Sequence, residues 1–134
     1  MGLRPYYLGD TSALARLGHP LVAVRLVPLL ESALVARCTP TDLEAGFSST
    51  SPASHRAMRA ERSAWPFVEM TQETLSRAVT VQDALAEGSQ QRGAKIADLL
   101  IAAAAEAAGL VVLHYDHDFD LIAVGFLRRA RPGR

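Results

Sequence analysis

The stretch IADLLIAAAAEAAGLVVLH, residues 96–114, decides the fold. Residues 96–108 are so rich in Leu, Ile and Ala that they predict a helix buried on nearly all sides. Gly109 follows, at a position where helices commonly end. Residues 110–114 are then a continuous apolar run, which is typical of a strand covered on both faces in a parallel sheet. A buried helix that leads into such a strand indicates an α/β protein.

The segments before this stretch also alternate between strands and helices. Residues 5–9 predict a first strand and residues 34–38 a second, with a helix over 20–32 that Pro28 should kink or split. The remaining segments are a helix starting near Pro40, a Ser-rich turn at 48–54, a helix to about 64, a weak strand at 67–70 and a polar helix over 71–90. We therefore predict an α/β/α sandwich with a mostly parallel central sheet.

Length and composition bound the class of protein. With 134 residues, 49% of them apolar, the chain predicts one globular domain over 1–134, with a weak terminal strand and a basic tail at about 124–134. Fourteen basic residues balance fourteen acidic ones, so net charge does not indicate a nucleic-acid partner. The single cysteine, Cys38, favours a reducing cytoplasm. We expect no signal peptide and no membrane span, because the longest apolar run, 99–105, is too short.

Four acidic residues stand where an α/β sheet binds its ligands, beyond the carboxyl ends of the strands and beside the helix N-termini. Asp10 ends the first strand, Asp116 follows the strand at 110–114, and Glu44 and Asp98 lie in or near the first turns of their helices. Four converging carboxylates repel one another unless a cation holds them. Hard oxygen ligands suit Mg²⁺, with Mn²⁺ as the other candidate.

Each acid also has a structural alternative. Asp10 is equally well placed to cap the following helix. Glu44 could complete a capping box with Thr41, but Pro40 at the first helical position favours Thr39 as the cap and Asp42 as the box residue. Asp98 resists such an alternative, because it stands in an apolar helix where an unpaired buried carboxylate is costly.

Two other metal sites fit the sequence poorly. The alternating acids of 116–120 suggest a calcium loop, but Leu121 stands where that loop needs Gly and Leu127 where it needs Glu. His114 and His117 suggest zinc, but no cysteine lies near them and the other histidines are isolated. The pattern of acids therefore favours metal-assisted phosphoryl transfer.

Four segments resemble the motifs of PIN-domain nucleases. LGDTSAL, residues 8–14, resembles the opening motif, KIADLLIA, residues 95–102, the central acidic helix, and LHYDHDF, residues 113–119, the final motif. TDLE, residues 41–44, is similar to the segment that carries the second acid. In order, spacing and length they resemble the VapC toxins of VapBC toxin–antitoxin modules over almost the whole chain.

The resemblance implies a PIN-like fold and a Mg²⁺-dependent endoribonuclease, with transfer or ribosomal RNA as substrate. Asp10, Glu44, Asp98 and Asp116 would form the catalytic metal pocket, supported by Asp118 and by the hydroxyls of Thr11 and Ser12. It also implies a VapB-like antitoxin and a homodimer. Two residues depart from the family pattern. His114 stands where Thr or Ser is common, which bears on how Asp116 is oriented. Gly9 stands where a larger residue is usual, which bears on how tightly the first strand ends.

An acidic pocket repels RNA, so cations should surround it. Arg92 and Lys95, just before Asp98, are the predicted RNA-binding residues. Arg56, Arg59 and Arg62 are spaced by three along one side of a helix, for which a solvated surface is the favoured interpretation. The helix over 20–33 has more apolar residues than one core-facing stripe uses, which is compatible with an antitoxin groove and with ordinary core packing.

Three other functions remain open. A receiver-like phosphoacceptor domain needs paired acids after the first strand and a late Lys, and here Asp10 stands alone and 110–120 contains no Lys. A PIN-fold module that binds nucleic acid without catalysis is disfavoured by four intact acids. A metal-dependent nuclease acting on DNA would use the same chemistry, and only a comparison of substrates separates it from a ribonuclease.

Overall fold

A parallel three-stranded sheet forms the centre of the molecule. The computed structural model describes residues 4–10, 14 and 20–114. Within them, β1 (Tyr7–Gly9) lies between β2 (Val35–Ala36) and β3 (Val111–Leu113), so the strand order is β2-β1-β3. Tyr7 is in register with Val35 on one side and with Val111 on the other, and both pairings are parallel. The prediction of a mostly parallel sheet is confirmed.

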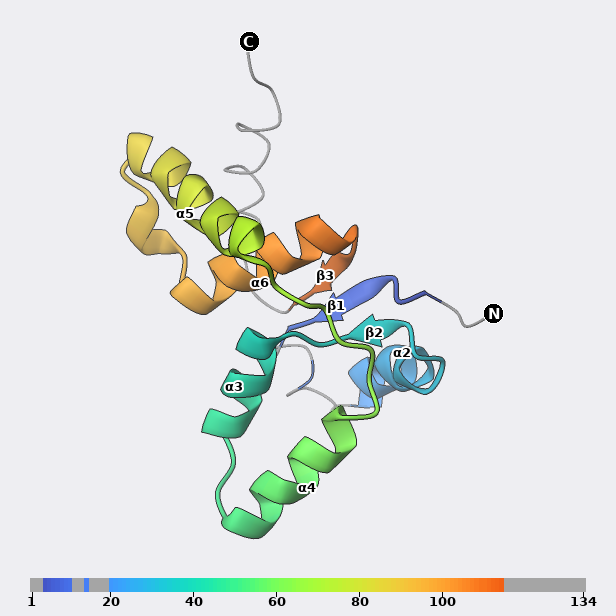
Figure 1. The fold of residues 1–134 in the computed structure, drawn as a ribbon. Helices are drawn as coiled ribbons and strands as arrows, with labels where there is room; N and C mark the ends of the chain where they lie inside the picture. The colour runs from blue at the N-terminus through green and yellow to red at the C-terminus, as the bar shows by residue number, and fades with distance from the viewer. Residues whose placement is uncertain (1–3, 11–13, 15–19, 115–134) are drawn as a thin grey trace.

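Helices cover both faces of this sheet, as Figure 1 shows. The helices α5 (Gln72–Glu87) and α6 (Ile96–Ala108) lie on one side, joined through a short 3-10 turn, η1 (Gln91–Gly93). On the other side lie α2 (Pro20–Glu31) and the hairpin of α3 (Thr39–Phe47) and α4 (Pro52–Arg62). This arrangement is the predicted α/β/α sandwich.

The core is formed mainly between α5, α6 and the sheet. Leu8, Val81, Leu85 and Ile101 are fully buried. The alanines of α6 at 102–105 are also buried, and their small side chains allow α5 and the sheet to approach closely. The prediction that residues 96–108 form a buried helix is therefore confirmed over most of its length, although Ile96 is exposed.

Three local predictions need correction. Pro28 does not split α2, which runs without interruption to Glu31. Because proline has no N–H, the Val24 carbonyl loses its helical donor. Pro28 and Val24 both lie on the exposed side of α2, where water can donate to that carbonyl instead. The expected strand at 67–70 is reduced to a single parallel bridge between Arg37 and Phe67. The strand β3 is not covered on both faces, since Val111 is 49% exposed at the edge of the described sheet.

Along the described ranges, none of the helices combines the length and the apolar character that crossing a membrane requires. The tail at 124–134 lies outside the described residues.

Candidate active site

Asp10 is held at the carboxyl end of β1. Its backbone N–H donates a hydrogen bond of 2.9 Å to the carbonyl oxygen of Leu113, the last residue of β3. Asp10 is buried, with a relative exposure of 3%. The central strand therefore delivers this carboxylate to the edge of the sheet where the chain also leaves β3 towards Asp116, three residues later.

Asp98 is the third residue of α6 and is 4% exposed. The helix α6 packs against β1, β3 and α3, so its first turn lies among the elements that carry the other predicted acids. No side chain caps the start of α6, whose N-cap is Lys95. The N–H groups at the start of a helix favour an anionic residue, which is one reason for an acid at position 98.

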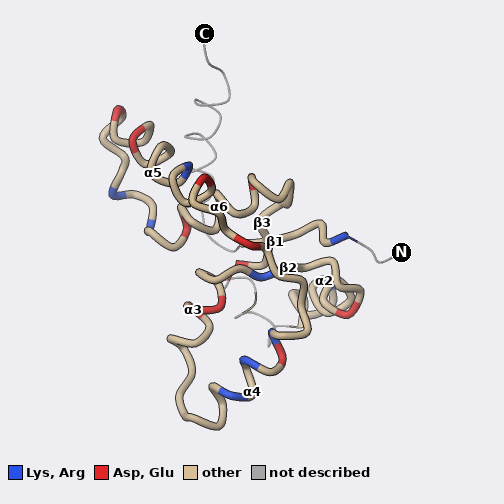
Figure 2. The backbone as a smooth tube through the Cα atoms, in the orientation of Figure 1, with Lys and Arg blue, Asp and Glu red and all other residues tan. Residues whose placement is uncertain are grey.

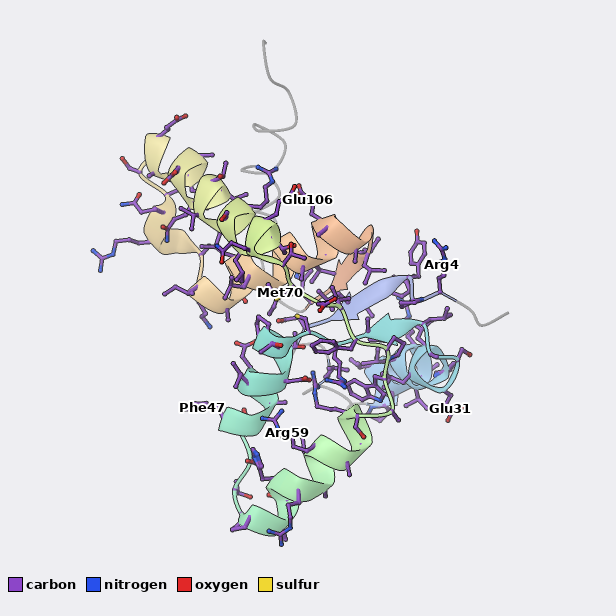
Figure 3. All side chains as sticks on the ribbon, viewed as in Figure 1. Arg4, Glu31, Phe47, Arg59, Met70 and Glu106 are labelled. Carbon is purple, nitrogen blue, oxygen red and sulfur yellow. The ribbon has the colours of Figure 1, made fainter. Side chains whose placement is uncertain are left out.

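Glu44 lies on the face of α3 that is turned towards α6. It lines a groove between α3 and α6 together with Pro40, Leu43, Ile96 and Leu100. It also borders a smaller hollow beside Phe47, which projects from α3 into solvent and is 93% exposed (Figure 3). Glu44 is half-buried, and Ala97, the neighbour of Asp98, lines the same groove.

The structure brings the predicted acids to neighbouring elements without completing a metal cluster. Across the described ranges, no three His, Cys, Asp or Glu side chains are close enough to hold a metal ion. Asp116 lies outside these ranges, as do the three supporting residues Thr11, Ser12 and Asp118. The assignment of Asp10, Glu44, Asp98 and Asp116 as a metal site stays a prediction.

The two predicted RNA-binding cations lie at the entrance to α6. Arg92 belongs to η1 and Lys95 is the N-cap of α6, and both are exposed. Figure 2 shows basic residues, in blue, along the connection between α5 and α6. Their assignment as RNA-binding residues stays a prediction.

The start of α3 differs from the prediction in a way that involves Asp42. The N-cap is Cys38 rather than Thr39, and the hydroxyl of Thr41, not Asp42, accepts the N-cap N–H at 2.9 Å. The carboxylate of Asp42 instead accepts hydrogen bonds from Arg37 Nη1 at 2.6 Å and Arg62 Nε at 2.9 Å. The prediction failed because α3 begins one residue earlier than expected, which places Thr41 rather than Asp42 at the box position.

The arginines of α4 are correspondingly not all on a solvated surface. Arg62 is 5% exposed, and Arg59 Nη1 donates to the backbone carbonyl of Asp42 at 3.1 Å. In Figure 3 the side chain of Arg59 extends from α4 towards α3. Among the three, only Arg56 is exposed as the sequence interpretation expected.

The structure shows what surrounds His114 and Gly9, the two residues that depart from the family pattern. His114 lines a hollow with Leu113 and with the α2 residues Leu21, Val22, Arg25 and Leu29, so it lies beside α2. Gly9 is buried, and a Cβ at this position would lie 2.9 Å from Val35 Cγ1. The side chain of Val35 therefore occupies the space that a larger residue at position 9 would fill.

The family model of the PIN domain matches residues 7–125, which include every acid discussed above. This chain belongs to the PIN-domain family. Curated relatives of this PIN domain cover most of it. Ribonuclease VapC51 of Mycobacterium tuberculosis is 50% identical over 117 residues, 87% of this chain and 85% of the relative. Ribonuclease VapC21 of the same species is 45% identical over 118 residues, 87% of this chain and 86% of the relative.

A solved structure supports the fold. The PIN domain described here superposes on the crystal structure of PAE2754 from Pyrobaculum aerophilum with a TM-score of 0.60. The match covers 96% of this chain and 100% of that chain, at 20% sequence identity. At that identity the likeness shows a shared architecture.

Proposed function

We propose that this PIN domain is a Mg²⁺-dependent endoribonuclease that acts as the toxin of a VapBC module in the cytoplasm. Structured RNA, such as the exposed loops of transfer or ribosomal RNA, is the proposed substrate, because unstacked bases in loops are the most accessible to a protein. The support comes from the close relatives named ribonuclease VapC and from the placement of the acids in this structure.

The observation that carries the proposal is the burial of two carboxylates on adjoining elements. Asp10 and Asp98 are 3% and 4% exposed; Asp10 directly follows β1 and Asp98 lies in the first turn of α6, and β1 and α6 pack against each other. Buried carboxylates in proteins are paired with other groups or coordinate a metal, and two of them on adjoining elements suit a shared divalent cation.

The donor set fits Mg²⁺. Carboxylate oxygens are hard ligands of the kind that Mg²⁺ prefers, and Glu44 lies on α3, which packs against the helix that carries Asp98. We propose that Asp10, Glu44, Asp98 and Asp116 hold the ion, with Asp118 and the hydroxyls of Thr11 and Ser12 supporting it. When bound, Mg²⁺ or Mn²⁺ lowers the pKa of a ligated water and stabilises charge on the scissile phosphate.

The chain's own residues would position the substrate. Lys95 and Arg92 are exposed cations that attract a phosphate backbone to an otherwise acidic pocket. No histidine is needed as a general base, and His114 lies beside α2. Hydrolysis by this route leaves a 5′-phosphate and a 3′-hydroxyl, so it does not depend on the 2′-hydroxyl of RNA.

The test is cleavage of total cellular RNA by the purified protein in Mg²⁺, in EDTA and with Asp98→Asn. We expect a few discrete cuts that require Mg²⁺ and vanish in the variant, and we expect single-stranded DNA of matched sequence to be left intact. Cleavage of DNA at an equal rate would assign a general nuclease. No cleavage by folded protein that binds Mn²⁺ would assign a module that binds without cutting.

A VapB-like antitoxin and a second copy of the chain are the proposed protein partners. The α2 hollow is mostly apolar, and Leu21 and Val24 beside it are 74% and 73% exposed, which suits the apolar face of an antitoxin segment. Co-expression with a cognate VapB-like antitoxin should suppress cleavage, and Leu21→Glu should weaken that suppression. Light scattering of the toxin alone tests the homodimer.

A further inference from the structure

The outer end of the α3–α4 hairpin carries basic residues and no acidic one. The whole sequence balances 14 basic residues with 14 acidic ones, but residues 45–60 contain neither Asp nor Glu. The same stretch includes one exposed aromatic residue and three basic side chains, and we call these four residues the hairpin end: Phe47, His55, Arg56 and Arg59. Figure 2 shows blue but no red at the end of the hairpin that lies farthest from the sheet.

The two arginines of the hairpin end are not neutralised by acids. Within the described ranges, neither Arg56 nor Arg59 belongs to an ion pair, unlike Arg62 on the same helix. Arg56 is exposed. Arg59 Nη1 donates to a neutral group, the backbone carbonyl of Asp42, at 3.1 Å. The hairpin end therefore offers positive charge to a negatively charged ligand.

Arg59 and His55 are held against α3 in a defined direction. A Cβ built at Gly46 would lie 3.0 Å from Arg59 Nη2 and 3.0 Å from His55 Cε1, so both side chains use the space that this glycine leaves free. Ser49 Oγ donates to the Gly46 carbonyl at 2.6 Å and lies 2.8 Å from His55 Nδ1. Because a hydroxyl has one proton, His55 Nδ1 donates to Ser49. These contacts orient the two side chains before a ligand binds, which lowers the entropy cost of binding.

Phe47 directly follows Gly46 and presents its ring to solvent. It is 93% exposed, the largest value among the large apolar residues of the described chain. Figure 3 shows it pointing from α3 away from the body of the molecule. The next four residues, 48–51, are Ser, Ser, Thr and Ser, so the ring stands beside hydroxyl groups and cations. Such surroundings suit a ligand that has both a flat apolar face and negative charge.

Single-stranded RNA has this combination of groups. Its phosphates bind arginine side chains, and its unpaired bases stack on aromatic rings. The bases of duplex RNA are already stacked on one another, so a duplex offers an exposed ring only its backbone. A cationic surface with an exposed aromatic ring therefore favours an RNA loop over a duplex.

We propose that the hairpin end binds a single-stranded loop of the RNA substrate, with Arg56 and Arg59 on phosphates and Phe47 stacked on an unpaired base. This inference rests on the proposed function and adds a binding surface to the cations at the start of α6. It does not depend on a bound metal. Phe47 borders the same small hollow as Glu44, so the surface adjoins a helix that carries one of the predicted acids.

The experiment measures the binding of a fluorescent RNA stem-loop by anisotropy in EDTA, with the blunt duplex of its stem as the comparison. For Phe47→Ala we expect about tenfold weaker binding of the stem-loop and little change for the duplex. The dependence on salt should stay the same, because stacking on a ring neutralises no phosphate. Phe47→Trp, which keeps a stacking surface, should retain the affinity of the wild type.

The arginine variants should change the salt dependence. Arg56→Gln and Arg59→Gln should each weaken binding and reduce the slope of log K against log salt by about 0.7, the value for one phosphate contact on a single strand. Gly46→Ala changes no charge and favours a helix, but its Cβ displaces Arg59 and His55. It should therefore weaken binding of the stem-loop in a folded protein.

Two variants serve as matched controls. Arg4→Gln removes an exposed arginine from the segment before β1. Val79→Ala truncates an apolar side chain on α5 that is 59% exposed. Both should bind the stem-loop as the wild type does.

The outcomes separate this inference from its alternatives. Equal affinity of the wild type for stem-loop and duplex, or unchanged stem-loop binding in Phe47→Ala and Arg56→Gln, would overturn it. Leu43, one turn before Phe47, is 61% exposed, so a protein partner is the main alternative for the ring. A lower molar mass of Phe47→Ala in light scattering, with unchanged RNA binding, would assign the ring to a second copy and overturn the inference. Stem-loop binding through the hairpin end without any RNA cleavage in Mg²⁺ would instead contradict the proposed function.

Discussion

The hydroxyl of Thr41 accepts a hydrogen bond from the backbone N–H of Cys38 at 2.9 Å and donates one to the carbonyl of Cys38 at 2.7 Å. Both residues are fully buried. The chain therefore leaves β2 and enters α3 through a turn in which one side chain satisfies both backbone groups of the N-cap. Because Asp42 and Glu44 follow directly, this turn fixes the start of the helix that carries them.

Replacing Thr41 with Val should destabilise the fold. The change keeps the shape but leaves the buried N–H of Cys38 without its acceptor, at a cost of about 1–3 kcal/mol, whereas the Cys38 carbonyl still accepts from Asp42 N–H at 3.0 Å. Ser54→Ala is the matched control, because Ser54 Oγ accepts from the N-cap Ser51 at 3.1 Å in an exposed capping box where water can replace it. Urea unfolding should show a clear loss for Thr41→Val and a small one for Ser54→Ala; equal losses would contradict the role given to burial.

Gly9→Ala should destabilise the sheet by overpacking. The new Cβ would lie 2.9 Å from Val35 Cγ1 and 3.5 Å from Leu14 Cδ1, so the strands must shift, at about 1–3 kcal/mol. Val35→Ala removes the close atom, and the double variant should be more stable than the sum of the single losses predicts. Strictly additive losses in a double-mutant cycle measured by urea unfolding would show that position 9 has room.

Gly109→Ala tests the end of α6. Gly109 has φ = 70°, a left-handed conformation, and no atom lies within 4 Å of a Cβ built there. The expected loss, about 1 kcal/mol, is therefore a backbone effect with no clash. Gly109→Asn should lose less, because Asn tolerates this region better than Ala. Thermal unfolding that ranks Ala above Asn would count against this explanation.

Cys38 should make stability depend on pH in the alkaline range. Burial raises the pKa of the Cys38 thiol above its ordinary value of 9.0, while hydrogen bonds with Thr41 partly oppose the shift. The unfolded thiol ionises at a lower pH than the folded one, so the stability is fully present below the ordinary value and is lost as pH rises through the folded value.

The measurement for this prediction is the unfolding free energy of the wild type and of Cys38→Ala between about pH 7 and pH 10. The wild type should lose more stability than the variant as the pH rises above 9.0. Parallel curves for the two proteins would mean that the thiol titrates equally in both states. Iodoacetamide should also modify Cys38 slowly in the folded protein, since the thiolate is the reactive form.

Mg²⁺ should stabilise the wild type by mass action. An ion that binds only the folded state adds about 2.7 kcal/mol at a concentration of 100 times its dissociation constant. The melting temperature should rise with added MgCl₂ in the wild type and stay constant in Asp10→Asn and Asp98→Asn, with NaCl of equal ionic strength as the control. A rise in all three proteins would indicate binding elsewhere.

Local sequence patterns were enough to predict most of the helices and strands. The apolar run before His114, the Ala-rich segment 96–108 and Gly109 each state a local preference that agrees with the tertiary fold, so β3 and α6 end within a residue or two of their predicted bounds. The predictions failed where packing decides. Pro28 is tolerated because its side of α2 meets water, and the segment at 67–70 pairs at one residue only.

The candidate site divides in the same way. The sequence by itself determined which residue types were available and in which order, and it predicted the edge of the sheet where they lie, because ligands of a parallel α/β fold bind beyond the carboxyl ends of its strands. Only the tertiary structure decided what each acid lies against: Asp42 meets Arg37 and Arg62, the latter twenty positions away, and Glu44 borders the groove beside α6. Ion pairing acts through space, so the sequence distance between two charges does not reveal it.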